Sequence, residues 1–318
     1  MSNDIISKRL GFKGLWVTIK KTIKAWWAAD PFRQSAVIAY YAIFSIPALL
    51  VIVVALAGLV FGEEAVRGEI SSQINAAMGE DAAKQIEVMI ANASEKETSV
   101  LATIIGFVTL VVGCTGVFAQ LQAELNQIWE VKVEAKKKWL RTLRDRFSSF
   151  GLVIAIGFLM LVSLILTAGL TALNGWIKAH LPDVMLYVFY LINFAVSFSV
   201  ITALFALMFK VLPDAQVRWK NVWIGAGVTA ALFILGKFLL GIYFGKADPG
   251  STYGAAGSIV LIMLWVSYSC MIVFLGAEFT KQYTLERGDK IIPRKDAKLV
   301  ESDEKVREVH DKRKAVGE

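Results

Sequence analysis

The sequence predicts an all-α fold, a polytopic membrane helical bundle with six transmembrane helices, an N-terminal amphipathic interfacial helix and a small outer helical lid. Mean hydropathy is +0.56 and 56% of residues are hydrophobic. Only 19% are charged, fewer than the quarter that soluble domains carry. Several apolar runs reach about 20 residues, enough to cross about 30 Å of hydrocarbon at about 1.5 Å per residue.

Residues 1–35 predict a basic amphipathic helix that lies in the headgroup region. At 100° per residue, Leu15, Ile19 and Ile23 share one face with tryptophans, while lysines lie opposite. The residues expected at the membrane surface are Lys20, Lys21, Lys24, Trp26 and Trp27. This helix is either a surface anchor or a dedicated lipid or partner site. Asp30 and Pro31 predict an N-cap and the first position of the next helix.

Residues 36–280 form the expected six-helix transmembrane domain. The spans are expected at 36–61, 100–120, 150–173, 185–212, 222–244 and 257–280. The insertion at 62–99 has eight acidic and three basic residues, and predicts two short amphipathic helices that form the outer lid. Their expected apolar stripes are Ile70, Ile74 and Met78, then Ile86, Met89 and Ile90. Residues 281–318 predict a charged, solvated cytoplasmic tail.

Lysine and arginine counts predict the orientation in the bilayer. The N-terminus, the second and fourth connections and the tail hold 28 of these residues, counting Lys210, whereas the other three connections hold 5. Because basic residues are retained on the cytoplasmic side, both termini are expected inside the cell. The positive net charge of +7 therefore reports topology rather than a nucleic-acid partner. The prediction is a multi-pass protein of the bacterial inner membrane.

The first span carries the candidate pathway residues Tyr40, Tyr41, Ser45 and Pro47. Pro47 cannot donate a hydrogen bond to the carbonyl of Ile43, so the helix is expected to bend there and expose a polar wall. The alternative is a bend with no binding role.

Two ionisable residues within later spans, Lys237 and Glu278, are further candidates, because charges in spans tend to face a bundle interior or a water-filled path. Lys237 is expected about 22 Å above the inner boundary and Glu278 within about 4 Å of it, so they should not touch. Glu278 is expected to meet Arg33, Lys210 or Asn126. Glu278 is either one member of an ion pair at the helix end, which holds the bundle together, or a gate in a pathway. Lys237 either extends its ammonium group toward the outer headgroups or faces the interior of the bundle.

Glycines in the last two spans predict close backbone approach between helices. They are Gly225, Gly227, Gly236, Gly241, Gly254 and Gly257.

Four segments in this order resemble the BrkB/YihY family of bacterial inner-membrane proteins, once labelled ribonuclease BN: AYYAIFSIPALL, GVFAQLQAELNQIWEV, RWKNVWIGAGVTAALF and YGAAGSIVLIMLWVSYSCMIVFLGAEFTKQY. The resemblance implies six spans with both ends cytoplasmic, and it brings associations with serum resistance, lipid handling and export rather than a settled activity. Asn126 follows the family pattern, whereas Glu124 stands where members more often have a small residue.

The ribonuclease label does not fit the residues. Metal-dependent hydrolysis needs clustered histidines and carboxylates, but the only histidines are His180 and His310, neither with a ligand pattern. We therefore expect no enzyme activity, no metal and no cofactor.

Two functions remain open: a transporter or exporter of an amphipathic envelope molecule or lipid, and a scaffold that organises envelope components. The expected partners are membrane lipids, anionic headgroups at the inner face and envelope proteins, without nucleic acid. Transport predicts one water-accessible cavity lined by Tyr40, Ser45, Asn126, Lys237 and Glu278; a scaffold needs none. The sequence names no substrate, direction, coupling ion or oligomeric state.

Overall fold

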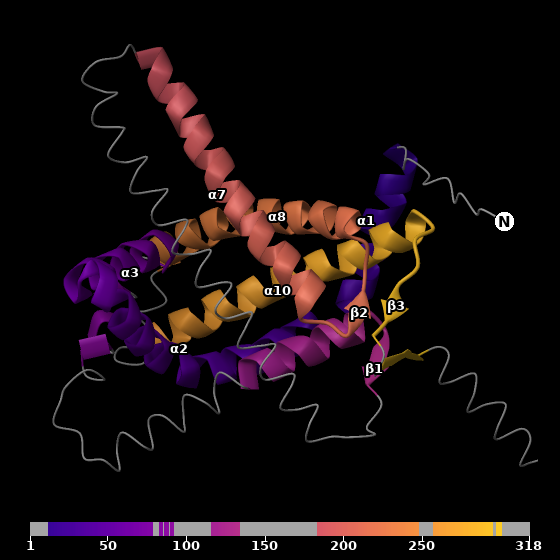
Figure 1. Cartoon of the computed structure of the whole chain (residues 1–318), viewed down its shortest axis with the longest axis horizontal. Coiled ribbons are helices and arrows are strands. Elements are labelled where there is room, and N and C mark those ends of the chain that lie inside the picture. The colour runs from indigo at the N-terminus through magenta and orange to yellow at the C-terminus, as the bar shows by residue number, and fades with distance from the viewer. Residues whose placement is uncertain are drawn as a thin grey trace, which may run out of the picture. The chain divides into compact units, whose positions relative to one another are not determined.

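The computed structural model describes residues 12–78, 83–84, 86–88, 90–91, 116–133, 183–247, 257–294 and 297–300. The helices in Figure 1 are α1 (Phe12–Ala28), α2 (Pro31–Phe61), α3 (Glu63–Met78), α7 (Asp183–Val211), α8 (Trp219–Ala247) and α10 (Gly257–Glu286). The strands are β1 (Val131–Val133), β2 (Ala215–Gln216), β3 (Ile292–Pro293) and β4 (Ala297–Leu299). Residues 116–128 and the described residues of 83–91 are also helical.

The chain divides into two compact units. Unit 1 comprises Met1–Trp26, Ala123–Ala231 and Phe274–Glu318, and unit 2 comprises Trp27–Gln122 and Leu232–Val273. Unit 1 therefore contains most of α1, all of α7, the four strands, the first part of α8 up to Ala231 and the last part of α10 from Phe274. Unit 2 contains α2, α3, the rest of α8 and the first part of α10.

Three described helices are long and apolar enough to cross a membrane. Their apolar stretches are Leu191–Val211 in α7, Trp219–Phe244 in α8 and Ile259–Glu286 in α10, which correspond to the fourth, fifth and sixth expected spans. The first expected span lies within α2, a continuous helix of 31 residues. The third expected span, 150–173, and most of the second, 100–120, lie outside the described residues. The helical membrane class is confirmed, and the total of six spans stays a prediction.

Two short antiparallel ribbons in unit 1 add strands to a described structure that is mostly helical, as predicted. Val131 of β1 pairs with Leu299 of β4, and Ala215 of β2 pairs with Pro293 of β3. Within the tail expected from residue 281, α10 continues to Glu286, and β3 and β4 lie at Ile292–Pro293 and Ala297–Leu299; a solvated, cytoplasmic tail stays a prediction. The segments VKV and AKL alternate apolar and polar residues, as half-buried strands do, but each is too short to be recognised alone.

Helix α1 is amphipathic as predicted, and its apolar face is exposed. Trp16 is 66% exposed and Ile23 is 53% exposed, whereas Thr18 is fully buried and Thr22 is 3% exposed. The threonine hydroxyls donate to carbonyls one turn earlier in the same helix, Gly14 at 2.9 Å and Thr18 at 2.8 Å. Packing therefore uses the threonine stripe, and the tryptophan face is left outside.

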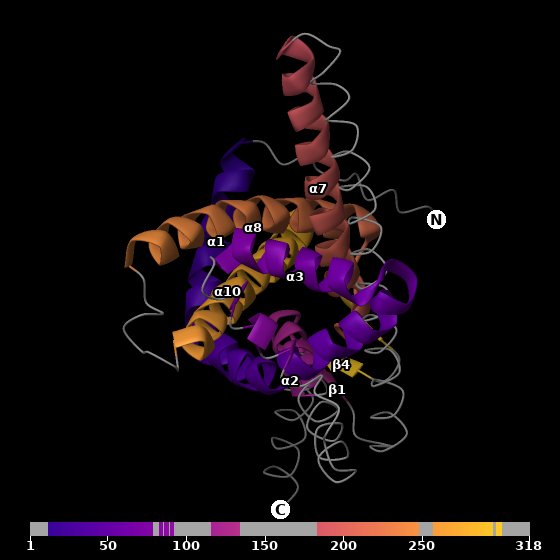
Figure 2. The same cartoon turned by 90° about the vertical axis from the view of Figure 1, so that its left-hand side faces the viewer.

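Helix α2 begins at Pro31, as predicted, but Asp30 makes no side-chain cap. Asp30 has φ 54°, outside the β region typical of a capping residue, and makes no capping hydrogen bond; its carboxylate accepts a hydrogen bond from Arg33 Nε at 3.1 Å. The helix continues through Pro47, and the Ser45 hydroxyl donates to the Ala42 carbonyl at 3.3 Å. Gly62, with φ 85°, separates α2 from α3, and both helices are labelled in Figure 2.

The core of unit 2 joins the described part of the 62–99 insertion to three long helices. Its buried members are Val54 of α2, Ile86, Ile90, Phe244 of α8, and Leu261 and Ile262 of α10. Ile70 and Ile74 of α3 pack against them, so two of the six residues in the predicted stripes are core residues and two more pack against the core. The placement of these helices as a lid on the outer side of the membrane stays a prediction.

Helices α8 and α10 meet in unit 1 through two reciprocal glycine–threonine contacts. A Cβ added at Gly225 would collide with Thr280, and one added at Gly276 would collide with Thr229. Each threonine hydroxyl donates to its own helix at 2.7 Å, Thr229 to the Gly225 carbonyl and Thr280 to the Gly276 carbonyl. The close approach predicted for Gly225 is thus present.

Of the other predicted glycines, Gly236 lies in unit 2 against Tyr268 and Ile272, while Gly227 and Gly241 have nothing within 4 Å of an added Cβ. Gly254 lies outside the described residues.

Candidate functional site

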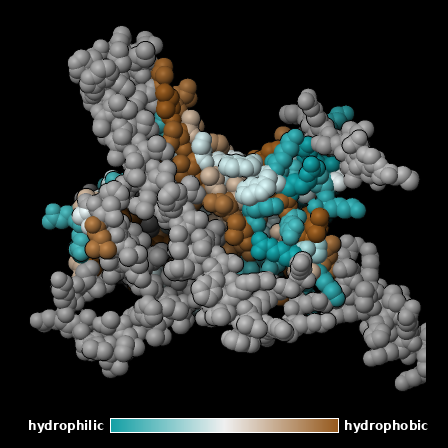
Figure 3. Space-filling model, in the orientation of Figure 1, coloured by the Kyte–Doolittle hydropathy of each residue, from teal (hydrophilic) through white to brown (hydrophobic). Residues whose placement is uncertain are grey.

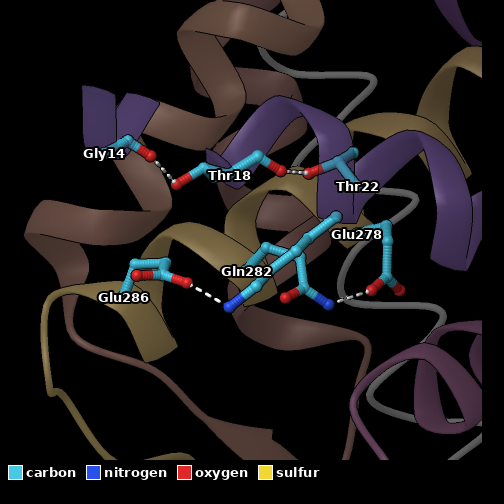
Figure 4. A network of polar contacts seen from close by, with 7 residues as sticks. Gly14, Thr18, Thr22, Glu278, Gln282 and Glu286 are labelled. Carbon is cyan, nitrogen blue, oxygen red and sulfur yellow. Dashed lines mark hydrogen bonds and ion pairs between the residues drawn. The ribbon is translucent and has the colours of Figure 1, made fainter. Parts of the chain in front are cut away.

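Buried polar residues gather on the last three turns of α10, and we call Glu278, Lys281 and Gln282 the α10 polar end. Glu278 is 4% exposed although it lies in a membrane-length helix. Its Oε1 accepts a hydrogen bond from Gln282 Nε2 at 2.7 Å (Figure 4). Lys281 Nζ lies 3.7 Å from the same oxygen. The spacings of three and four residues place all three side chains on neighbouring positions of one helix.

Lys281 is shared by two carboxylates with different surroundings. Its Nζ donates to Glu130 Oε1 at 2.8 Å, and the Glu130 side chain is 58% exposed whereas that of Glu278 is 5% exposed. Glu130 has a left-handed φ of 54° and follows the helix at 116–128. One ammonium group thus connects a buried acid to a solvated one.

Helix α1 contacts the same end of α10. Lys21 of α1 donates to Glu286 Oε1 in the last turn of α10, and Figure 4 shows Thr18 and Thr22 on the adjacent face of α1 beside Glu278 and Gln282. A carboxylate in the last turn of a helix is unfavourable beside the partial negative charge of its C-terminus. The Lys21 ammonium offsets this cost and holds α1 against α10.

Asn126 and Asp214 form a buried two-bond pair. Asn126 Nδ2 donates to Asp214 Oδ2 at 2.9 Å, and the Asp214 backbone N–H donates to Asn126 Oδ1 at 2.7 Å. Asn126 is 9% exposed and Asp214 is 2% exposed. Both ends of the asparagine amide are therefore used to connect the helix at 116–128 to the loop that follows α7.

Asp289, just after α10, connects this segment to the start of α8. Its carboxylate accepts hydrogen bonds from Asn221 Nδ2 and Arg218 Nη1, both at 2.8 Å. Desolvation alone would raise the pKa of Asp289, but these hydrogen bonds and the charges of Arg218 and Arg287 outweigh it, so the pKa lies below its ordinary value.

The C-terminus of α7 is capped by the segment that follows α10. Arg294 Nη2 donates to the carbonyls of Val211 at 3.0 Å and Lys210 at 3.4 Å. Lys210 Nζ donates to the Val217 carbonyl at 2.5 Å and lies 5.5 Å from the centroid of the Trp219 ring. The Arg294 contacts satisfy carbonyls in the last turn of α7 that have no partner within the helix.

The partners predicted for Glu278 are not the ones it has. Asn126 bonds to Asp214 and Lys210 to the Val217 carbonyl, while Arg33 pairs with Asp30 in unit 2. The predicted partners lie on other helices, whereas the nearest donors, Lys281 and Gln282, lie on the same helix, three and four residues after Glu278. The spacing of EFTKQ could have revealed Lys281 and Gln282; nothing in the sequence indicates Glu130 or Asp214 as a partner.

The other pathway candidates lie in unit 2. Tyr40 is 56% exposed, with its ring 5.2 Å from that of Phe44 and 5.8 Å from that of Tyr41. Tyr41 lies against Gly116, where a Cβ would collide with its ring. Ser45 is 5% exposed, and Lys237 is half-buried with no ion pair to any described residue. A cavity common to these residues, Asn126 and Glu278 stays a prediction.

Trp129 adds an unsatisfied donor to unit 1 that sequence reasoning missed. Its side chain is fully buried, and its indole Nε1 has no hydrogen-bond acceptor in the described part of the chain. Buried polar atoms nearly always have a partner. Trp129 immediately precedes Glu130, the residue that binds Lys281. Among the described residues there is no group of three side chains that could hold a metal ion.

The class of protein follows from these features. Three described helices are of membrane length. Two of them, α8 and α10, pack closely through glycines, and a buried polar network lies at the end of α10, so the chain is an integral membrane protein with a helical transmembrane domain. Hydrophobic residues cover the visible face of α7, whereas hydrophilic residues gather where α1 and the end of α10 lie (Figure 3).

Comparison with known proteins gives the family. The family model described as virulence factor BrkB matches residues 22–299, and the chain belongs to this family. The chain is 30% identical over 177 residues to a UPF0761 membrane protein of Verminephrobacter eiseniae, covering 55% of this chain and 40% of the relative. A UPF0761 membrane protein of Tolumonas auensis is 30% identical over 183 residues, 56% of each chain.

A third relative, the UPF0761 membrane protein of Psychrobacter, is 26% identical over 270 residues, 83% of this chain and 48% of the relative. The chain thus spans about half the length of the curated relatives it matches. No solved structure matches.

Proposed function

We propose that the protein is a transporter or exporter of an amphipathic envelope molecule, such as a lipid, in the bacterial inner membrane. The observation that carries the proposal is the Glu278 carboxylate, 4% exposed in a membrane-length helix. A buried ionisable group costs stability unless it is paired, and in membrane helices it tends to mark a substrate or ion path. The indole N–H of Trp129, which has no acceptor among the described residues, lies beside the same network and supports a binding role.

The proposal includes six spans with both termini in the cytoplasm and no enzymatic activity. The excess of lysine and arginine in alternate connections supports the orientation. The α10 polar end would then lie at the cytoplasmic mouth, where Glu278 acts as a gate or clamp. The helices of the 62–99 insertion would cover the opposite end.

Reconstitution in liposomes tests transport. Purified protein would be compared with Glu278→Gln for movement of fluorescent phospholipid and of ions across the bilayer. The glutamine keeps a side-chain oxygen for Gln282 Nε2, so the variant should fold. We expect flux above that of empty liposomes, and at least a tenfold loss in the variant. If the wild type moves no candidate faster than empty liposomes do, transport of those molecules is refuted.

The alternative function is a scaffold for envelope components, and the ribbons β1–β4 and β2–β3 favour it. They join segments far apart in the sequence, and the exposed Lys132 and Lys298 face each other across β1 and β4. In-cell crosslinking from positions on β4 would separate the two functions. A scaffold predicts discrete envelope-protein partners that persist in Glu278→Gln, with no flux in liposomes.

A further inference from the structure

Helix α1 is packed with its most apolar face outward. Trp16 and Ile23 are 66% and 53% exposed, while the face turned to the protein carries the buried Thr18 and Thr22. A surface helix of a water-soluble protein turns its apolar face inward, because burial of apolar area stabilises the protein by roughly 25 cal/mol per Å². This orientation is stable only if the tryptophan face is covered by something other than water.

The contacts of α1 set its depth in the membrane. Lys21 pairs with Glu286, the last residue of the apolar stretch of α10. The start of α8 lies at the same level, because Asn221 bonds to Asp289 just beyond α10. Both segments therefore lie where the apolar helices end, which is the level of the phospholipid headgroups.

Tryptophan and lysine alternate on the exposed surface of these two segments. Trp219 and Trp223 at the start of α8 are each 48% exposed, and Lys220 between them is exposed. We call these residues and their counterparts in α1 the interfacial belt: Trp16, Lys20, Lys24, Trp219, Lys220 and Trp223. Lys20 and Lys24 form no ion pair with any described residue, and α1 contains four lysines and no acidic residue.

We infer that the interfacial belt binds anionic phospholipid headgroups selectively. The indole rings are suited to the boundary between acyl chains and headgroups, and the free ammonium groups attract the negative charge of the headgroup. Charge complementarity selects this occupant over a neutral lipid or a second copy of the chain, whose α1 would bring the same lysines against these. The inference does not depend on transport.

Native mass spectrometry of the full-length protein in detergent tests the inference. Phosphatidylglycerol and phosphatidylcholine of equal chain length would be titrated separately, and their affinities compared for the wild type and Lys20→Gln/Lys24→Gln. Each lysine near an anionic surface contributes about fivefold in affinity, so we expect an approximately 25-fold loss for phosphatidylglycerol. Affinity for phosphatidylcholine should stay within about twofold.

Two further variants make the result specific. Lys132→Gln/Lys298→Gln removes the same charge from a pair that faces across β1 and β4, and it should keep the selectivity of the wild type. Trp16→Ala should weaken both lipids to a similar degree, because it removes apolar contact without changing charge. Thermal melting of each variant checks that it is folded.

Three outcomes would overturn the inference. The first is that the wild type binds both lipids equally. The second is that the Lys132/Lys298 control loses as much selectivity as the Lys20/Lys24 variant. The third is that millimolar inorganic phosphate displaces phosphatidylglycerol. The last result would mean a site for small anions rather than for a lipid surface. A shift from dimer to monomer in Lys20→Gln/Lys24→Gln, without a change in lipid binding, would instead assign the belt to a second copy.

Discussion

Asn126→Ala tests whether this residue holds the fold together or lines a pathway. The substitution removes both hydrogen bonds between Asn126 and Asp214. In one, Asn126 Nδ2 donates to the Asp214 carboxylate at 2.9 Å, and in the other the Asp214 backbone N–H donates to Asn126 Oδ1 at 2.7 Å. A hydrogen bond to a charged group contributes about 1.5–3 kcal/mol and a neutral one about 0.5–1.5 kcal/mol. Because Asp214 is 2% exposed, water does not replace the lost amide, and we expect a loss of about 3 kcal/mol in the free energy of unfolding.

Steric-trapping measurements of unfolding in lipid bicelles would give this free energy. Gln127→Ala is the matched control, because Gln127 is the next residue of the same helix and its side chain is exposed. We expect the control to change the free energy of unfolding by less than about 0.5 kcal/mol. If Asn126→Ala is no more destabilising than the control, the pair with Asp214 does not stabilise the fold, and a pathway role becomes the better explanation.

The remaining predictions concern helix contacts around α8 and α10. Gly225→Ala places a methyl group against Thr280, and this overpacking should lower the free energy of unfolding by about 1–3 kcal/mol in the same assay. Gly227→Ala is the control, because an added Cβ there has open space around it, and it should not lower this free energy. Equal effects of the two substitutions would contradict the close contact at Gly225. The pKa of Asp289 is lowered in the folded state by Asn221 and Arg218, so its stabilisation is complete above about pH 4 and is lost as the pH falls through the folded pKa. Thermal melts from pH 7 to pH 3 should therefore show the advantage of wild type over Asp289→Asn shrinking only in acid, and an advantage that grows in acid would refute this.

The sequence predicted the features that depend on local periodicity. Spacing at 100° per residue separated Ile19 and Ile23 from the lysines of α1, and the same rule found Ile70 and Ile86, which pack into the core of unit 2. Hydropathy located α7, α8 and α10, because their apolar runs are long. These predictions need no knowledge of the partner segment.

The features that were missed depend on residues far apart in the chain. Val131 pairs with Leu299, and a three-residue strand has too few positions to show alternation clearly. Likewise, Lys281 meets Glu130, 151 positions away, at a turn where Glu130 has a left-handed φ of 54°. A single sequence contains no signal for such a pairing.

Glu278 and Asn126 can be told apart because their contacts differ in kind. Both the amide nitrogen and the amide oxygen of Asn126 form hydrogen bonds with Asp214. Loss of the Asn126 side chain should therefore lower stability and leave the flux of each folded molecule unchanged. Glu278→Gln keeps an acceptor for Gln282 and loses only the attraction of a lysine 3.7 Å away. A variant that folds normally but has lost flux would therefore assign Glu278 to the transport path. A variant with lower stability and normal flux would make the α10 polar end a clamp between helices.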